Sequence, residues 1–410
     1  MNRRKQVAIT CIAVVLFICG CQDGEVLPVV PDLAIANEDE SLHEAADIPP
    51  ISIVVTCVGD VMVHKSQIAA QYDSSTDTYD YSNNFVYVKK YIENSDLALC
   101  NLETTFGGKP YTGYPVFSAP DELAKALKAT GFDVAMTANN HMMDRGVSGL
   151  TRTISVLQEN GILATGSREE PGQPEYVIID VNGVKVCVIA YTYAASSSSG
   201  DLLINGSAVS RDAAFLINYF RYDHIDEDLQ KINGAVNEAK KAGADIVIVY
   251  YHWGEEFQLK PNERQRYIAE RTAGSMDVDI IFASHPHTPQ EISSVASGKT
   301  GVQVPVYYSL GNFISNQRVE TLDVMNKKYT EIGAIARVVI DYDKEEGEIV
   351  RIDAAAIPTW VEKYRVGGRD IYAVVPLDEG LEANESLAAS GHLGRAKKAW
   401  EDANGILGID

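Results

Sequence analysis

The sequence has little positive charge. It contains 35 lysine and arginine residues against 57 aspartate and glutamate residues, which gives a formal net charge of -22 at pH 7. Such an acidic chain is a poor partner for nucleic acid or for an anionic membrane surface, because both carry charge of the same sign. We therefore expect no nucleic-acid partner.

Paired cysteines are missing from the main part of the chain. After Cys21 the sequence contains only Cys57, Cys100 and Cys187, each inside an apolar run. An odd number of cysteines in such places argues against a disulfide framework, and the absence of CxxC spacing argues against a zinc site with thiolate ligands. We expect these side chains to be small buried hydrophobic groups.

The motifs of several common catalytic sites are also missing. The chain has no GxSxG nucleophile elbow, no Walker A loop and no GxGxxG after a predicted strand. Serine-hydrolase, P-loop and dinucleotide-binding functions therefore have no support. The serine-rich stretch at 196–199 indicates a flexible loop.

Long apolar runs are confined to the N-terminus. Basic residues at 3–5 precede apolar residues 7–20, which is the pattern of a secretory signal peptide and is short for a membrane span. The run ends in the letters ICGC, which resemble a bacterial lipobox with Cys21 as the lipidated residue. An ordinary cleaved signal or an uncleaved anchor helix is the alternative. We expect an extracytoplasmic protein held at the cell membrane by a lipid anchor.

Composition divides the chain into four parts. Residues 1–21 form the predicted lipoprotein signal peptide, and residues 22–50 form an acidic tether without lysine, arginine or aromatic residues. A segment of this composition cannot bury enough apolar surface to fold. Residues 51–372 are long enough for a large core and form the predicted catalytic body. The Ala-rich residues 373–410 are predicted to form a helical tail.

Strand-like apolar runs alternate with helix-like stretches in the body. Strands are predicted at 51–58, 96–100, 132–137, 176–181, 184–191, 245–250, 278–283, 304–309, 332–341 and 348–356. Helices are predicted at 84–93, 121–130, 148–160 (with Ser148 as the cap), 225–242 and 261–275. Asn182-Gly183 is a strong hairpin signal between two of the strands. A mixed two-sheet α/β sandwich with outer helices fits this pattern.

Six short polar motifs follow the apolar runs directly. They read GDVM, NLE, ANNH, HWGEE, SHPH and SLGNF. In open α/β sheets, functional groups gather beyond the carboxyl ends of strands. One sheet edge would then collect carboxylates, carboxamides and imidazoles, which are the N/O donors of a divalent metal site.

Single motifs have simpler explanations. Asp60 alone reads as a turn residue, although the preceding Gly59 would let the backbone approach an ion. His285 and His287 flank a proline and would face the same side of an extended segment, with two hydrogen-bonded structural histidines as the alternative. His64 lies four residues after Asp60 but has no other supporting context.

In this order, the six motifs resemble the poly-γ-glutamate capsule synthesis (CapA) family, which is related to the calcineurin-like metallophosphoesterases. The resemblance extends over about residues 51–358. It implies a four-layer αββα sandwich of two mixed sheets and a role in capsule or cell-surface polymer biosynthesis. It also implies one or two divalent metal ions, of Mn, Fe, Zn or Mg.

The resemblance assigns roles to individual residues. The metal ligands are Asp60, Glu103, Asn140, His252, His285 and His287. The catalytic residues are His141 and Asn140, and we add as substrate-binding residues Asn101, Asn139, Glu255 and Asn312. Met62 stands where the metallophosphoesterase Asp-x-His pattern has a histidine, and Glu103 replaces a bridging aspartate. We therefore expect one firm metal site and a weaker second one.

Three functions stay open from the sequence. The first is a metal-dependent hydrolase or transferase that acts on an anionic polymer or a phosphoester, with metal-activated water as the nucleophile. The second is a non-catalytic metal- or polymer-binding subunit of a capsule synthesis or export complex, with a capsule synthase or export membrane protein as its partner. The third is a sensor of extracellular metal or phosphate. The donor set favours the first.

Overall fold

The computed structural model describes residues 49–409, which form a mixed α/β body on two large β-sheets. The α/β class predicted from the sequence is therefore confirmed. The predicted signal peptide, Cys21 and the tether up to residue 48 lie outside the described residues. Among residues 49–409, no helix has the length and apolar character that a bilayer crossing needs.

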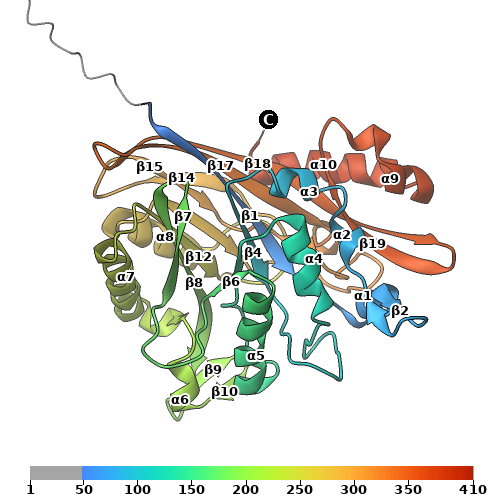
Figure 1. Cartoon of the computed structure of the whole chain (residues 1–410), viewed down its shortest axis with the longest axis horizontal. Helices are drawn as coiled ribbons and strands as arrows, with labels where there is room; N and C mark the ends of the chain where they lie inside the picture. Colours follow the sequence, from blue (N-terminus) through green and yellow to red (C-terminus); the bar gives the residue numbers. More distant parts are fainter. Residues whose placement is uncertain (1–48, 410) are drawn as a thin grey trace, which may run out of the picture. The chain divides into compact units, whose positions relative to one another are not determined.

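The first sheet has 8 strands, with a parallel half and an antiparallel half (Figure 1). The parallel half contains, in spatial order, β1 (Ile51–Val61), β4 (Leu97–Leu102), β5 (Val134–Met136) and β6 (Leu163–Thr165). The antiparallel half continues from β1 with β17 (Ile332–Asp343), β18 (Glu348–Val366) and β19 (Arg369–Pro376). The short β16 (Asn312–Ile314) also pairs with the end of β1.

The second sheet has 9 strands around a parallel centre. The centre consists of β8 (Val184–Ser196), β12 (Ile246–His252), β13 (Ile280–Ser284) and β15 (Gln303–Tyr307). The other strands are β7 (Tyr176–Val181), β9 (Leu202–Ile204), β10 (Ser207–Val209), β11 (Tyr219–Arg221) and β14 (Ile292–Ala296). β7 and β8 form the antiparallel hairpin that Asn182-Gly183 predicts.

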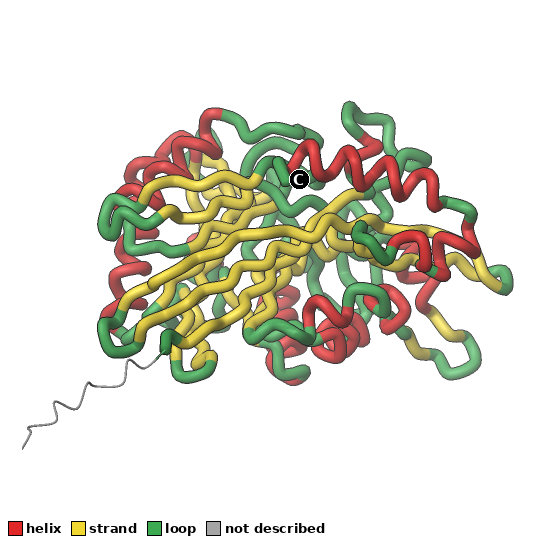
Figure 2. The backbone as a smooth tube through the Cα atoms, turned by 90° about the horizontal axis from the view of Figure 1, so that it is seen from above, coloured by secondary structure: helices red, strands yellow, loops and turns green. Residues whose placement is uncertain are grey.

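The largest cluster between the sheets contains alternate residues of strands from both. Val55 of β1 and Leu99 of β4 pack in one cluster with Ile248 of β12 and Phe282 of β13. Side chains on a strand point to opposite faces in turn, so each central strand also needs cover on its other side. Figure 2 shows the strands running through the middle of the body with helices around them.

Helices cover the outer face of each sheet. The first sheet is covered by α1 (Lys65–Gln71), α2 (Ser82–Phe85), α3 (Lys89–Ile92), α4 (Glu122–Thr130) and α5 (Gly146–Glu159). The second sheet is covered by α7 (Ile225–Lys241) and α8 (Glu263–Ser275), and the short α6 (Arg211–Ala214) lies beside β9 and β10. Acidic residues in the first turn of α7 and two lysines in its last turn match the helix dipole.

Two helix predictions are wrong in detail. The helix predicted at 84–93 is two short helices, because β-branched Val86 and Val88 lie in the interval and disfavour a continuous helix. Ser148 does not cap α5, which begins two residues earlier at Gly146 after a turn at 141–145. The Ser148 hydroxyl instead donates to the Arg145 carbonyl inside the first turn.

The C-terminal segment packs on the first sheet. The boundary expected after Tyr372 lies inside β19, and the helices that follow are α9 (Glu385–Ser390) and α10 (Leu393–Leu407). They cover Trp360 and Val375 in one apolar cluster. Glu331, which is buried, accepts from Trp360 at 3.0 Å and from Arg395 of α10 at 2.9 Å.

Gly59 serves strand packing beside Asp60. A Cβ atom on Gly59 would lie 1.9 Å from the carbonyl oxygen of Gly311. That carbonyl accepts from the backbone N–H of Asp60 at 2.9 Å. Gly59 therefore sets how closely β16 approaches β1 beside Asp60.

We expect Gly59→Ala to destabilise the body by about 3 kcal/mol or more, because β16 must move away from β1. Gly234→Ala is the matched control. Gly234 is an exposed residue of α7 with open space around it, so the same added methyl should stabilise by about 0.5–1 kcal/mol. Urea unfolding of both variants measures the difference. Equal effects would show that the β1–β16 contact is not tight.

Candidate functional site

Strands from both sheets bring their carboxyl ends to one place. The predicted site residues lie there in a continuous network of contacts. They are Asp60 in β1, Glu103 just after β4, Asn140 and His141 after β5, His252 at the end of β12, and His285 and His287 after β13. The first three groups come from the first sheet and the others from the second.

Three overlapping groups of donors could hold metal ions. In each group, one ligand atom from every member lies within 4.8 Å of the others. The groups are Glu103–His252–His285, Asp60–Glu103–His287 and Glu256–His285–His287. Glu103, His285 and His287 each belong to two groups, so the donors form one cluster. Of these residues, Glu256 alone is exposed.

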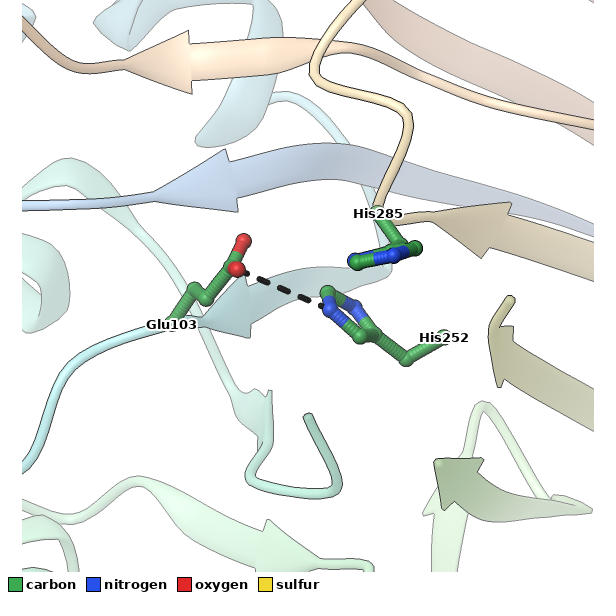
Figure 3. A group of neighbouring side chains, drawn as sticks. All are labelled: Glu103, His252 and His285. Atoms are coloured by element: carbon green, nitrogen blue, oxygen red, sulfur yellow. Dashed lines mark ion pairs between the residues drawn. The ribbon is translucent and has the colours of Figure 1, made fainter. Parts of the chain in front are cut away.

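Glu103 is the centre of this cluster. Its side chain is 0% exposed, and within residues 49–409 neither carboxylate oxygen has a hydrogen-bond partner. Figure 3 shows Glu103, His252 and His285 pointing toward one another, with Glu103 Oε1 3.6 Å from His252 Nε2. Oε1 also lies 3.8 Å from His287 Nε2. These distances exceed hydrogen-bond length and leave the carboxylate without close compensation.

A divalent cation fits this place. A buried carboxylate is costly unless it is paired or bound to a metal. The donors are carboxylate oxygens and imidazole nitrogens without thiolates, which suits Zn, Fe, Mn or a similar ion. Burial, together with the charge of Asp60, raises the pKa of Glu103 well above its usual range.

Asn140 and His252 face the same point from opposite sheets. Asn140 Oδ1 lies 2.7 Å from His252 Nε2, and both side chains are buried. The other ring nitrogen of His252 lies 3.3 Å from Asn101 Nδ2. Asn101 in turn donates to Asp60 Oδ1 at 2.7 Å. The Asn140 carboxamide and the His252 imidazole are thus placed together as candidate ligands. The Asn101 amide supports the His252 ring from its other side.

His285 and His287 lie in a strained loop and not in the extended segment that the sequence predicted. Their φ angles are 104° and 56°, a region that residues other than glycine seldom adopt. The two rings are 5.9 Å apart. Within the described residues, Nδ1 of His285 has no hydrogen-bond partner. Strain of this kind persists where surrounding structure holds a site in place.

Asp60 and His287 form a buried pair. Asp60 Oδ2 lies 3.0 Å from His287 Nδ1, and both residues are buried. Burial opposes both charges, but the hydrogen bond and the mutual attraction outweigh it, lowering the pKa of Asp60 and raising the pKa of His287. Nε2 of His287 is left for the cluster around Glu103.

The other two imidazoles of the cluster are neutral. Burial lowers the pKa of His252 to about 3, and burial together with the nearby His252 lowers the pKa of His285 well below its usual range. A neutral imidazole has a free lone pair, which is the form that binds metal. Tyr193 packs against His285 at 4.7 Å between ring centroids and helps to hold the ring.

His141 lies at the edge of the cluster and is oriented by Asp144. His141 Nδ1 lies 2.8 Å from Asp144 Oδ2, and the same oxygen accepts from the backbone N–H of Phe117 at 2.6 Å. The Phe117 ring packs edge-on against the His141 ring at 4.6 Å. Because Nδ1 is engaged, Nε2 is the nitrogen available to a ligand. The sequence analysis missed Asp144, although its position three residues after His141 is a usable signal.

Two cavities open beside the cluster. The first has a volume of about 390 Å³ and is lined by Met62, His64, His141, Phe257, His287 and Leu322, among others. The second has a volume of about 360 Å³ and is lined by Asn140, His141, Asp144, Ile204, Asn205 and Ser207, among others. Tyr114, His141 and Glu256 line both cavities, so the two meet at His141.

The residues predicted to bind substrate lie in different surroundings. Asn139 is buried, donates to Leu102 O at 2.8 Å and accepts from the His141 N–H at 3.1 Å, so it fixes the chain beside the site. Asn101 contacts Asp60 and His252, as described above. Asn312 is buried and donates to Thr330 O at 2.9 Å. Glu255 is exposed and lines neither cavity, whereas the adjacent Glu256 lines both.

His64 joins the site although its sequence context gave little support. It lines the first cavity, and its Nδ1 accepts from the backbone N–H of Asn316 at 3.2 Å. Its ring packs edge-on against Phe117, which also contacts His141. Burial lowers the pKa of His64 to about 4, so the ring is neutral. Its position four residues after Asp60 was the available signal.

Known proteins are similar to this chain in sequence. The capsule biosynthesis protein CapA of Bacillus anthracis is 30% identical over 307 residues, which cover 71% of this chain and 68% of that protein. The PGA biosynthesis protein CapA of Bacillus subtilis (strain 168) is 29% identical over 271 residues, which cover 63% of this chain and 62% of that protein. The shared region thus spans about two thirds of each relative.

Among solved structures, the calcineurin-like phosphoesterase YfkN from Bacillus subtilis has a TM-score of 0.41 at 14% identity, covering 87% of this chain and 100% of that chain. This likeness is weak, and the chemistry of the site is derived from its own residues. Residues 54–317 match the sequence profile of the bacterial capsule synthesis protein PGA_cap. The match contains every motif from Asp60 to Asn312 and more than half of the chain, so the chain belongs to the PGA_cap family of bacterial capsule synthesis proteins.

Proposed function

We propose that this chain is a metal-dependent hydrolase or transferase that acts on a phosphoester during synthesis of a capsule or another cell-surface polymer. The observation that supports the activity is the buried Glu103 carboxylate, unpartnered within the described residues, between imidazoles from two strands. Membership of the capsule synthesis family supports the biological process. A fold and a family do not fix the chemistry by themselves, so the site carries the argument.

Divalent ions would be held by the six side chains predicted from the sequence, with Glu256 as an exposed addition. They are Asp60, Glu103, Asn140, His252, His285 and His287. When bound, such ions polarise a phosphoryl oxygen and lower the pKa of a bound water to about 7. Two overlapping donor groups around one carboxylate are compatible with one or two ions.

The chain supplies its own proton donor. His141 can hold a proton at Nε2 and give it to the oxygen of the departing group, since it lines both cavities. Asp144 fixes the orientation of the ring through its contact with Nδ1 at 2.8 Å. Asn139 holds the backbone of His141 in place.

We further propose that the protein works outside the cytoplasm, anchored to the cell membrane by a lipid on Cys21. The basic, apolar and ICGC segments of the N-terminus support this location. The acidic tether would let the body extend from the membrane to a polymer. Membrane proteins of capsule synthesis or export would be its partners.

Glu103→Gln should weaken metal binding while it preserves side-chain shape. A ligand that binds only the folded state stabilises it by about 2.7 kcal/mol at 100 times its Kd. We expect Mn²⁺ to stabilise the EDTA-treated wild-type protein in this way in urea unfolding, and to stabilise Glu103→Gln by less than half as much. Glu255→Gln, an exposed acid outside the donor groups, is the matched control and should behave as the wild type. Equal stabilisation of all three proteins would exclude Glu103 as a ligand.

His141→Ala should lower kcat by about 10²–10⁴-fold, the usual contribution of a positioned acid. Mn²⁺-induced stabilisation should remain, because His141 belongs to none of the donor groups. The loss should be larger for an alkyl phosphoester than for a nitrophenyl phosphoester, since nitrophenolate departs without a proton. Asp144→Asn should show the same preference with a smaller loss. Identical losses for the two leaving groups would contradict proton donation by His141.

Cys21→Ser should release the protein from the membrane fraction, because serine has no thiol for the lipid. Cell fractionation and labelling with radioactive palmitate measure both effects. Cys19→Ser, in the same segment, should keep the label and the membrane location. A labelled, membrane-bound Cys21→Ser protein would exclude Cys21 as the anchor.

A further inference from the structure

The two cavities beside the cluster meet at one group of residues. They share Tyr114, His141 and Glu256, while their remaining linings differ completely. The first, with Met62, Phe257 and Leu322, is largely apolar, and the second, with Asn205 and Ser207, is more polar. A substrate whose reacting atom lies at His141 would therefore have room for a substituent on each side.

Charge distinguishes the substrates that this arrangement can hold. Among the described residues that line these two cavities, there is no lysine or arginine, and the Glu256 carboxylate faces both. A terminal phosphate monoester is a dianion near neutral pH and would meet this carboxylate with no lysine or arginine among the described lining residues of the two cavities to balance the second charge. A phosphodiester has only one negative charge and bears a substituent on each of two oxygens.

Two basic residues line a further hollow next to the second cavity. A third hollow, of about 570 Å³, adjoins the second through Tyr114, Pro115, Val116 and Asp144. Its lining contains Lys65 and Arg145. Because these two cations line the third hollow and neither of the first two cavities, they suit the next negative charge of a repeating chain and not the reacting group itself. Tyr114 is 73% exposed and lines all three hollows.

We infer that the site acts on an internal phosphodiester link of a polyanionic chain and not on a terminal phosphate. This inference rests on the proposed function. In hydrolysis, the oxygen of water forms a bond to phosphorus and the bond from phosphorus to the departing oxygen breaks. The departing oxygen keeps the electron pair and takes the proton from His141 Nε2. The proton of the attacking water passes to solvent, from which His141 is protonated again. The products are an alcohol and a phosphate monoester.

The first test compares two substrates on the full chain loaded with Mn²⁺. We expect kcat/KM for bis(p-nitrophenyl) phosphate to exceed that for p-nitrophenyl phosphate by about tenfold or more, which is the scale of discrimination that pocket contacts provide. Calorimetry supplies a comparison without turnover, in which diethyl phosphate should bind more tightly than inorganic phosphate.

The second test fills the second cavity. Ser207 lines it, and Ala208, the next residue of β10, does not. Ser207→Trp should lower the ratio of diester to monoester kcat/KM about tenfold, because the bulky ring takes the place of one substituent. Ala208→Trp adds the same ring to the opposite face of the exposed strand and should leave the ratio unchanged. Circular dichroism of both variants checks that they fold.

The outcomes separate the two proposals. Turnover of the monoester with little turnover of the diester, or equal ratios in the two tryptophan variants, would overturn the diester inference and leave the phosphoesterase function standing. Cleavage of a γ-glutamyl peptide without cleavage of either phosphoester would overturn both. Faster diester turnover together with the selective effect of Ser207→Trp supports the inference.

Discussion

A buried carboxyl group without a hydrogen-bond partner is the constraint on which the rest of this structure depends. Glu103 is fully enclosed, and neither of its oxygens finds a hydrogen bond within residues 49–409. Taking such a carboxylate out of water is unfavourable unless a cation compensates it. Asp60 engages His287, and His252 and His285 are held neutral, so the side chains nearby leave most of this charge uncompensated. A divalent cation held by the proposed ligands would compensate it.

The two sheets together make the cluster possible. The first supplies the buried carboxylates and Asn140, and the second supplies the imidazoles of the donor groups and the exposed Glu256. The apolar layer between the sheets fixes their spacing, and the close approach at Gly59 fixes the strand that carries Asp60. Around the donors, Asn101, Asn139 and Asp144 hold the ligand and acid side chains in place by hydrogen bonds. This supporting layer converts neighbouring residues into a site with defined geometry.

The sequence analysis identified the α/β class, the hairpin at Asn182-Gly183 and most strands, because these depend on local hydrophobic periodicity and turn chemistry. It also selected every buried donor of the three groups, because polar residues directly after buried strands must lie at a sheet edge, but it missed the exposed Glu256. It erred where distant contacts decide the outcome. The extended segment predicted at His285 and His287 is such a case, because both residues adopt φ angles that no neighbour in the sequence requires. The close contact of Gly59 with Gly311, 252 positions along the chain, also depends on the tertiary structure.

The sequence by itself determined the type of chemistry, since an inventory of carboxylates, carboxamides and imidazoles without paired thiols belongs to N/O metal ligation. Only the tertiary structure decided which of these groups share one centre, which of them instead support their neighbours, and that Asp144, His64 and Glu256 belong to the site. The physical reason is that composition and strand patterning act along the chain. Desolvation, hydrogen-bond geometry and cavity shape arise only when segments far apart in the chain pack against one another.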